Sequence, residues 1–305
     1  MSVATSDRLF VLEAIPPEAI PPRLLSVSLD GSDVRVLIDK LGGTPDGIAI
    51  DYLRGQVYWT NMGADWSKND GFIERINVDG SNRIVIIPEG ATFTPKQMQV
   101  DAEAGLIYWC DREGMRVMRS RVDGGDITVL VQTGATEADR ADERRHCVGI
   151  AIDRAGGRLY WTQKGPPKGN QGRILSAPLD LPADMSPSAR TDIQVVFDGL
   201  PEPIDLEWDE ENDTLYWTDR GAPPRGNTLN CCRFSGGRSG AIGILIEGLE
   251  EGIGLALDKT RHRAFVSDLG GNLWTAALHG ARQSHVIRAG LGSLTGIALW
   301  RPSGG

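Results

Sequence analysis

Short runs of β-branched and aromatic residues recur along the whole chain, and glycine, aspartate or asparagine bounds nearly every one of them. The run at 46–51, DGIAID, is continuously apolar between its turn residues, which is typical of a strand buried on both faces. Helical periodicity is nearly absent from the sequence. The hydrophobic pattern therefore predicts an all-β protein.

The runs form a repeat of about 50 residues. One aspartate closes the first run of each copy, and successive aspartates are 50, 52, 56 and 49 residues apart: Asp51, Asp101, Asp153, Asp209 and Asp258. Each copy contains four strand signals. Four strands in a unit of this length are typical of one blade of a β-propeller.

The two ends of the chain supply a sixth blade. Residues 8–14, 24–31 and 34–38 match the second, third and fourth strands of the repeat, whereas 295–300 matches a first strand and then stops. We therefore predict a single domain over 1–305, a six-bladed β-propeller with four-stranded antiparallel blades. The C-terminal strand is expected to close the ring by joining the N-terminal blade.

A four-letter motif marks the second strand of most copies. It reads YWTN at 58–61, YWCD at 108–111, YWTQ at 160–163 and YWTD at 216–219, with a degenerate FVSD at 265–268. On these motifs the chain resembles the YWTD (low-density lipoprotein receptor class B) six-bladed propellers. The resemblance implies that the Tyr-Trp pairs pack between blades and that the Thr and Asp side chains tie neighbouring strands, with ligand stacking as the alternative. The degenerate copy is expected to be tied more loosely.

The amino-acid composition limits the classes of partner that the protein is expected to bind. The net charge of −9 disfavours a nucleic-acid surface, because such surfaces depend on clustered Lys and Arg. The sequence contains no membrane-spanning apolar run and no secretory signal pattern, so we expect a cytoplasmic protein without membrane partners. The four cysteines show no zinc spacing and are expected to be free thiols. The oligomeric state stays open.

The lengths of the loops indicate which face of the propeller carries the functional site. Turns between first and second strands are short, whereas long segments at 13–23, 61–71, 163–172 and 220–227 all belong to the opposite face. The link at 133–147 lies on that face too, and it contains the one expected helix, with Thr136 and Asp139 forming its capping box. Long loops on a rigid scaffold usually carry function, so the channel mouth on this face is the expected site.

Charged residues of these loops are the catalytic candidates. The loops that begin at Lys164 and Arg220 share the pattern KGPPKGN and RGAPPRGN, and their cations are expected to hold an anionic or polar ligand oxygen; the alternative is a repeated structural turn. His146 is a candidate acid or base next to an inner strand, and Asp65 is the alternative proton carrier. Arg112 is expected to assist Lys164 and Arg220 in holding the ligand.

Polar residues at the ends of the second strands are the substrate-binding candidates, since they should form a ring with Glu13 around the channel mouth. An alternative is that they only form hydrogen bonds between blades. Trp66 joins the candidates because no scaffold role requires an aromatic residue in its loop, and Lys68 follows it closely. The full set is Asn61, Trp66, Lys68, Asp111, Arg112, Gln163, Asp219 and Asp268.

No motif of a nucleophilic hydrolase, zinc protease, calcium loop or nucleotide-binding loop is present. The loops NMGADWSKNDG and RGAPPRGN resemble those of a microbial subgroup that includes fungal hetero-Diels–Alderases of tropolone-sesquiterpenoid biosynthesis. The resemblance implies a lyase- or cyclase-like enzyme without cofactor or metal, acting on a tropolone and a terpene. It would dehydrate a tropolone-type alcohol to a quinone methide and add it to an olefin.

Two alternatives to this activity remain at the level of sequence. One is a protein- or ligand-binding scaffold without catalysis, as in the receptor propellers. The other is a metal-dependent lactonase or hydrolase, with Glu13, Asp46 and Asp205 as the imaginable ligands.

Overall fold

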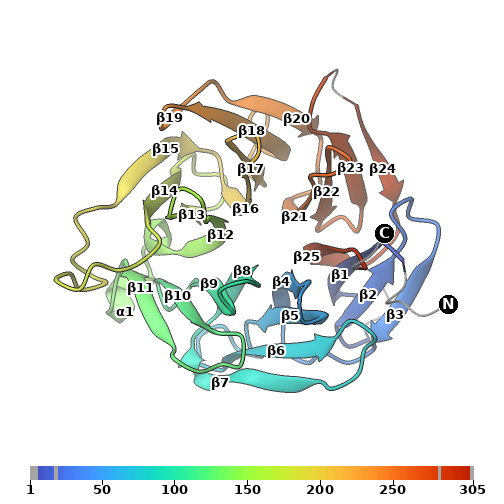
Figure 1. The fold of residues 1–305 in the computed structure, drawn as a ribbon, viewed down its shortest axis with the longest axis horizontal. Coiled ribbons are helices and arrows are strands. Elements are labelled where there is room, and N and C mark those ends of the chain that lie inside the picture. Colours follow the sequence, from blue (N-terminus) through green and yellow to red (C-terminus); the bar gives the residue numbers. More distant parts are fainter. Residues whose placement is uncertain (1–5, 17–19, 281–282, 303–305) are drawn as a thin grey trace.

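Six antiparallel sheets are arranged as a ring of blades in the computed structural model, which describes residues 6–16, 20–280 and 283–302 (Figure 1). The first strand of each blade lies nearest the ring axis and the fourth lies at the rim. The predicted all-β, six-bladed architecture is confirmed.

Three blades occupy the first half of the ring. Blade 1 contains β4 (Pro45–Asp51), β5 (Gln56–Asn61), β6 (Gly71–Asn77) and β7 (Ile84–Thr92). Blade 2 contains β8 (Pro95–Asp101), β9 (Leu106–Asp111), β10 (Arg116–Arg121) and β11 (Thr128–Gln132). Blade 3 contains β12 (Cys147–Asp153), β13 (Arg158–Gln163), β14 (Gly172–Pro178) and β15 (Gln194–Leu200).

Three further blades complete it. Blade 4 contains β16 (Pro203–Asp209), β17 (Thr214–Asp219), β18 (Thr228–Ser235), the short β19 (Arg238–Ser239) and β20 (Gly243–Glu247). Blade 5 contains β21 (Gly252–Asp258), β22 (Arg263–Asp268), β23 (Leu273–Ala277) and β24 (Ser284–Arg288). Blade 6 combines the chain ends: β25 (Ser293–Trp300), β1 (Arg8–Ile15), β2 (Arg23–Val27) and β3 (Val34–Ile38).

Pairing between the two ends of the chain closes the ring. Strand β25 is antiparallel to β1, with Leu9 opposite Leu299 and Phe10 opposite Ala298. This is the closure that the sequence predicts. It leaves no unpaired inner strand, which removes the exposed sheet edge that an open ring would carry.

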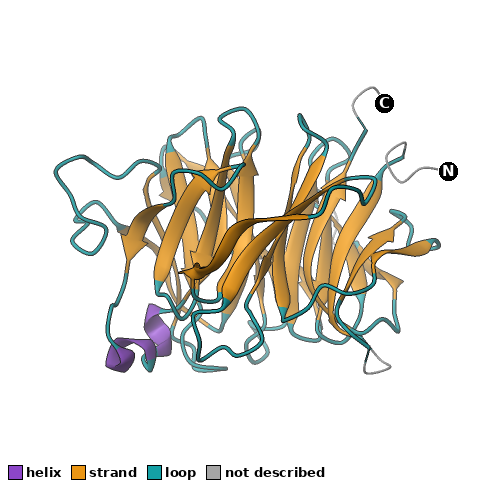
Figure 2. Ribbon diagram, turned by 90° about the horizontal axis from the view of Figure 1, so that it is seen from below, coloured by secondary structure: helices purple, strands orange, loops and turns teal. Residues whose placement is uncertain are grey.

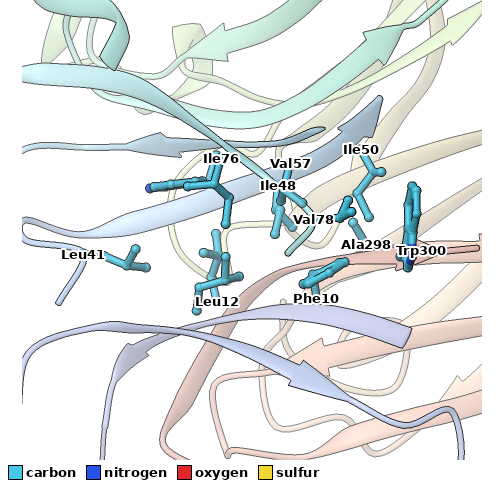
Figure 3. Packing of buried hydrophobic residues seen from close by; sticks show 12 residues of the cluster. Phe10, Leu12, Leu41, Ile48, Ile50, Val57, Ile76, Val78, Ala298 and Trp300 are labelled. Carbon is cyan, nitrogen blue, oxygen red and sulfur yellow. The ribbon is translucent and has the colours of Figure 1, made fainter. Parts of the chain in front are cut away.

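The core consists of apolar clusters between neighbouring blades. The cluster between blades 6 and 1 contains Phe10 and Leu12 of β1 together with Val57 of β5 (Figure 3). Trp59 of β5 belongs to the same cluster. The four tryptophans of the repeated motif, Trp59, Trp109, Trp161 and Trp217, are all among the largest fully buried side chains. The Tyr-Trp pairs are therefore scaffold, as the family resemblance implies.

Hydroxyl groups of the motif connect adjacent inner strands. The Thr60 hydroxyl accepts a hydrogen bond from the Gly47 N–H of its own blade and donates one to the Lys96 carbonyl of the next, both at 2.8 Å. Thr218 makes the same pair of contacts with Asp205 N–H and the Ile253 carbonyl. Ser267 of the degenerate copy still donates to the Thr295 carbonyl, so blade 5 retains this link.

The two faces of the ring differ as expected. Antiparallel connection of successive strands places turns such as 52–55 on one face, here called the short-turn face. It places the loops 62–70, 164–171 and 220–227 on the other, the long-loop face. Helix α1 (Glu137–Arg140) and the 3-10 turn η2 (Glu143–Arg145) lie on the long-loop face (Figure 2).

Local details of the chain agree with two further expectations. Thr136 and Asp139 form the predicted capping box of α1. The four cysteines are free of disulfides, and Cys110, Cys147 and Cys232 are buried. In the part of the chain that the structure describes, no helix is long and apolar enough to span a membrane.

Candidate functional site

The ring of polar strand-end residues binds the main chain of the links between blades. Asn61 accepts hydrogen bonds from Thr44 N–H and Gly63 N–H, both at 3.0 Å. Asp111, Asp219 and Asp268 accept equivalent N–H groups of links 93–94, 202 and 250. All four side chains are fully buried. Asp111 also pairs with Arg116, and Asp268 accepts hydrogen bonds from the side chains of Asn272 and Trp274. The partners of all four residues are thus groups of the scaffold.

Glu13 and Gln163 extend this arrangement. Glu13 pairs with Arg23 and accepts the Gly292 N–H at 2.8 Å, and Gln163 accepts a hydrogen bond from Arg173 at 2.6 Å. Burial raises the pKa of Asp219 to about 7, although the N–H groups of Gly221 and Glu202 oppose the shift. Acceptors held this way fix the loop bases and so shape the long-loop face.

The two catalytic candidate cations meet at one carboxylate. Arg220 contacts Glu202 through Nε at 2.8 Å and through its terminal nitrogen at 2.7 Å. Lys164 lies 3.6 Å from the same carboxylate and 3.2 Å from Glu143. Glu202 also accepts the Lys168 N–H at 3.1 Å. The matching loops therefore converge on Glu202, which is only 2% exposed.

A second buried charge cluster lies at the start of the inner strands. Lys96 of β8 forms an ion pair with Asp46 of β4, and Gln97 donates to the same carboxylate at 2.9 Å. Burial lowers the pKa of Lys96 to about 8; the nearby Arg112 and Arg220 reinforce the shift, and Asp46 opposes it. An amine with this pKa exchanges protons near neutral pH.

Arg112 connects this cluster with the exposed rim. Its guanidinium group stacks on the Trp66 ring, with 5.1 Å between the guanidinium carbon and the ring centroid, and pairs with Glu113 at 2.6 Å. Although burial opposes ionisation of Glu113, the hydrogen bonds from Arg112 and Thr94 lower its pKa. Trp66 is 48% exposed. This pair presents an aromatic surface beside the long-loop mouth.

His146 and Asp65 differ sharply as proton carriers. His146 is buried, its Nε2 lies 2.8 Å from the Arg140 carbonyl, and burial lowers its pKa, so the ring is neutral at pH 7 with Nδ1 as its acceptor nitrogen. Asp65 lies in an exposed turn 3.2 Å from Lys68, and the Ser67 hydroxyl lowers its pKa to about 2. A carboxylate with so low a pKa is a weak base.

The residues at the position of Asp46, which is the second residue of five inner strands and the third residue of β25, form a ring with two unlike halves at this mouth. Val148, Ile204 and Ile253 of blades 3, 4 and 5 make an apolar cluster with Leu269. Asp46, Lys96 and Thr295 of the other three blades are polar. The mouth is thus apolar on one side and charged on the other.

Sequence reasoning missed Lys96, Glu113 and Glu202. Lys96 carried a readable signal, because the copies at 148–153 and 253–258 have an apolar residue where β8 has lysine in an inner strand. Glu202 lies in a link outside the repeat, and no local pattern connects it with Lys164 or Arg220. Its role depends on two loops that meet only in space.

The carboxylates considered as metal ligands each have separate partners. Glu13 pairs with Arg23, Asp46 pairs with Lys96, and Asp205 accepts the N–H groups of Leu206 and Leu255, both at 2.9 Å. Among the described residues, no group of three or more His, Cys, Asp or Glu side chains is arranged to hold a metal ion. These three residues therefore do not fit a shared metal.

The fold and this site define a six-bladed β-propeller with a charged, partly apolar channel mouth. Residues 7–52 match the family model described as low-density lipoprotein receptor repeat class B. The chain is 45% identical over 313 aligned residues to a protein of Pyricularia oryzae named low-density lipoprotein receptor-related protein 1, covering 98% of this chain and all of that one. The protein belongs to the low-density lipoprotein receptor class B (YWTD) propeller family.

Other similar proteins differ in name and extent. The chain is 36% identical to the 3-hydroxyacyl-CoA dehydrogenase-like protein LAM1 of Cochliobolus heterostrophus, covering 98% of this chain but 66% of that protein. A chain from a crystal structure of a nidogen/laminin complex superposes with a TM-score of 0.72 at 18% identity, covering 96% of this chain and 98% of that one. A gluconolactonase from Xanthomonas campestris superposes with a TM-score of 0.61 at 18% identity, covering 93% and 89%. At such identities the two structures show a shared fold alone.

Proposed function

We propose that the protein is a cofactor-independent enzyme of secondary metabolism whose active site is the long-loop mouth of the channel. The observation that carries this proposal is the divided ring of inner-strand residues, with Lys96 and Asp46 on one side and Val148, Ile204 and Ile253 on the other. A buried amine beside an apolar wall suits a substrate with an acidic or strongly polar oxygen and a hydrocarbon body.

The reaction that fits best is the one expected from the hetero-Diels–Alderase resemblance. Lys96 in its ammonium form would donate a proton to the departing hydroxyl of a tropolone-type alcohol as the carbon–oxygen bond breaks and water leaves. Neutral His146 would accept the proton of the ring hydroxyl, which gives the neutral quinone methide. His146 is preferred to Asp65 because the low pKa of Asp65 makes it a weak base.

The second step needs no proton transfer. One carbon–carbon and one carbon–oxygen bond form between the quinone methide and the olefin of a terpene such as a humulene derivative. Arg112 and Arg220, whose charges act on Lys96, would polarise the heterodiene oxygen, while the apolar half of the mouth would hold the olefin. The YWTD scaffold would contribute rigid placement of both partners.

Tropolone binding can be measured separately from catalysis, and it tests the role of Lys96. We expect isothermal titration calorimetry to detect tropolone binding to the protein and at least tenfold weaker binding to Lys96→Met, which keeps the side-chain length but removes the charge. The matched control is Lys40→Met, because Lys40 is exposed and lies outside the site. Equal affinity for all three proteins would overturn the role of Lys96.

Catalysis requires a second measurement. Incubation with a hydroxymethyl tropolone precursor and humulene, followed by mass spectrometry, should give the cycloadduct with the protein and with Lys40→Met, and much less with Lys96→Met. An adduct that forms at the same rate without protein would refute the enzymatic role.

A protein-binding scaffold is the second candidate function. The exposed Trp66–Arg112 pair at the rim favours it, since tryptophan and arginine dominate many interface hot spots. Tropolone binding that depends on Lys96 would favour the enzyme, whereas its absence would favour the scaffold.

A further inference from the structure

Four of the six inner strands carry small residues at two positions where the other two inner strands carry polar side chains. At the third and fifth positions counted from Pro45, four blades carry glycine and then alanine: Gly47 and Ala49, Gly149 and Ala151, Gly254 and Ala256, Gly296 and Ala298. A Cβ atom at Gly149 would overlap the Ile204 carbonyl oxygen of the next inner strand. Close packing of inner strands thus requires glycine there.

Blades 2 and 4 carry polar side chains at the same positions. These are Gln97 and Gln99 in β8, and Asp205 and Glu207 in β16. Four blades show that the ring closes with small residues alone, so the scaffold does not require these groups. Burying polar groups is unfavourable unless they are paired. Gln97 and Asp205 are paired within the wall, with Asp46 and with backbone N–H groups.

Gln99 and Glu207 line a cavity at the short-turn end of the channel. Its volume is about 440 Å³, within the usual range for small-molecule pockets. Ile48, Ile50, Val100, Ala256, Ala298 and Leu299 are among its apolar lining residues. The fifth strand position lies about 10 Å from the second, at roughly 3.3 Å per residue, so this cavity is distinct from the Lys96 mouth.

The polar end of the cavity offers mainly acceptors. Gln99 Nε2 donates to Glu207 Oε1 at 3.2 Å and to the Leu206 carbonyl at 3.5 Å, although its blade and that of Glu207 are separated by blade 3. These two contacts use the donors of the Gln99 amide. What remains for a ligand is the amide oxygen of Gln99 and the carboxylate of Glu207.

Other charged groups of the cavity already have partners. Arg301 pairs with Asp258, which also lines the wall, and Lys259 donates to the Trp208 carbonyl at 2.8 Å. The Tyr52 hydroxyl donates to the Leu299 carbonyl at 2.7 Å. Among the ion pairs of the described residues, none involves Glu207. Lys259 acts on Glu207 electrostatically, but no direct ion pair occupies this carboxylate, so a ligand cation can still pair with it.

We propose that this short-turn cavity is a second binding site, and that it takes a small organic amine in its ammonium form. The ammonium group donates hydrogen bonds to Glu207 and to the amide oxygen of Gln99. The hydrocarbon body packs against the apolar wall formed by β4, β8, β21 and β25. A carboxylate ligand is disfavoured because it would face Glu207.

The site also predicts a pH dependence. Burial raises the pKa of Glu207 to about 7, opposed by Lys259 and by the Gln99 hydrogen bond. Asp205 on the same strand also interacts with Glu207, and Tyr52, Asp258 and Arg301 line the same space. Since an ammonium ligand requires ionised Glu207, its affinity should increase as pH rises from 5.5 to 8.

Benzylamine is a suitable probe, with benzyl alcohol and benzoate as analogues of the same shape. Calorimetry at pH 8 should show benzylamine binding more tightly than benzyl alcohol, with no measurable binding of benzoate. Glu207→Gln should weaken benzylamine binding at least tenfold and remove the pH dependence. Glu211→Gln, an exposed carboxylate in the adjoining turn, is the matched control and should bind as the unchanged protein does.

Thr260→Trp provides a variant that leaves Glu207 intact. Thr260 is an exposed lining residue, so a tryptophan there should obstruct the cavity and abolish benzylamine binding. Equal benzylamine binding by Glu207→Gln and the unchanged protein would overturn the proposal, and so would preferential binding of benzoate. Tropolone binding at the Lys96 mouth is measured separately, so failure of either site is distinguishable from failure of the other.

Discussion

Lys96 and Asp46 form a buried ion pair between the inner strands of two adjacent blades, with side-chain exposures of 10% and 2%. The pair lies where blades 3, 4 and 5 carry apolar residues. Burial of two charges is seldom a net source of stability, because desolvation opposes their attraction. A functional role accounts for the pair more readily than a scaffold role does.

Removing one charge of this pair should destabilise the protein more than removing both. Asp46→Asn leaves the buried Lys96 without its counter-ion, and we expect a loss of about 3 kcal/mol in the free energy of unfolding at pH 6.5. Asp46→Asn combined with Lys96→Met should recover most of that loss. Urea denaturation of both single variants and the double variant measures the coupling; a double variant no more stable than Asp46→Asn would contradict this account.

The hydroxyl group of Thr218 should matter more than its methyl group. Thr218→Val removes the acceptor of Asp205 N–H and the donor to Ile253 while keeping the shape of the side chain. The buried N–H then lacks a partner, which should cost about 1–3 kcal/mol. Thr218→Ser retains both hydrogen bonds and should remain closer to the unchanged protein in urea denaturation. Equal stability of the two variants would show that the hydroxyl is dispensable.

Glu207 should make the protein less stable as pH rises. Its pKa is about 7 in the folded protein against an ordinary value of 4.5, so the folded state retains a proton that the unfolded state has lost. The contribution of Glu207 to the free energy of unfolding therefore falls between about pH 4.5 and 7, by at most about 3 kcal/mol, and is constant above that. Glutamine does not ionise, so Glu207→Gln lacks this pH-dependent contribution to the free energy of unfolding.

The check is urea denaturation of the protein and of Glu207→Gln at pH 5, 6, 7 and 8. Stability of the unchanged protein relative to the variant should decrease from pH 5 to 7 and change little between pH 7 and 8. A difference that is constant or increases with pH would show that Glu207 titrates near its ordinary value.

Two buried thiols should resist modification in the folded protein. Burial raises the pKa of Cys147 to about 12 and that of Cys110 well above its ordinary value, so neither forms appreciable thiolate at pH 8. Ellman's reagent should leave both unmodified in the folded protein, and all four cysteines should react in guanidinium chloride. Rapid reaction of Cys110 or Cys147 in the folded state, mapped by mass spectrometry, would contradict their burial.

The sequence by itself determined the six blades, the closure of β25 on β1, the capping box of α1 and the placement of long loops on one face. The blades and their closure follow from a pattern repeated about every 50 residues, the capping box from its local residues, and the loop placement from antiparallel connections that alternate between faces. The family motif also identified the Tyr-Trp pairs as scaffold, and their burial confirms it.

Only the tertiary structure decided how the charges are paired. Lys164 and Arg220 meet at Glu202, Lys96 meets Asp46, and Gln99 meets Glu207 from a blade two positions away along the ring. Each contact joins residues from different loops or blades, and no local pattern records such distances. The reason is physical: ring closure fixes which side chains share a low-dielectric space, and this burial shifts the pKa values of Lys96 and Glu207.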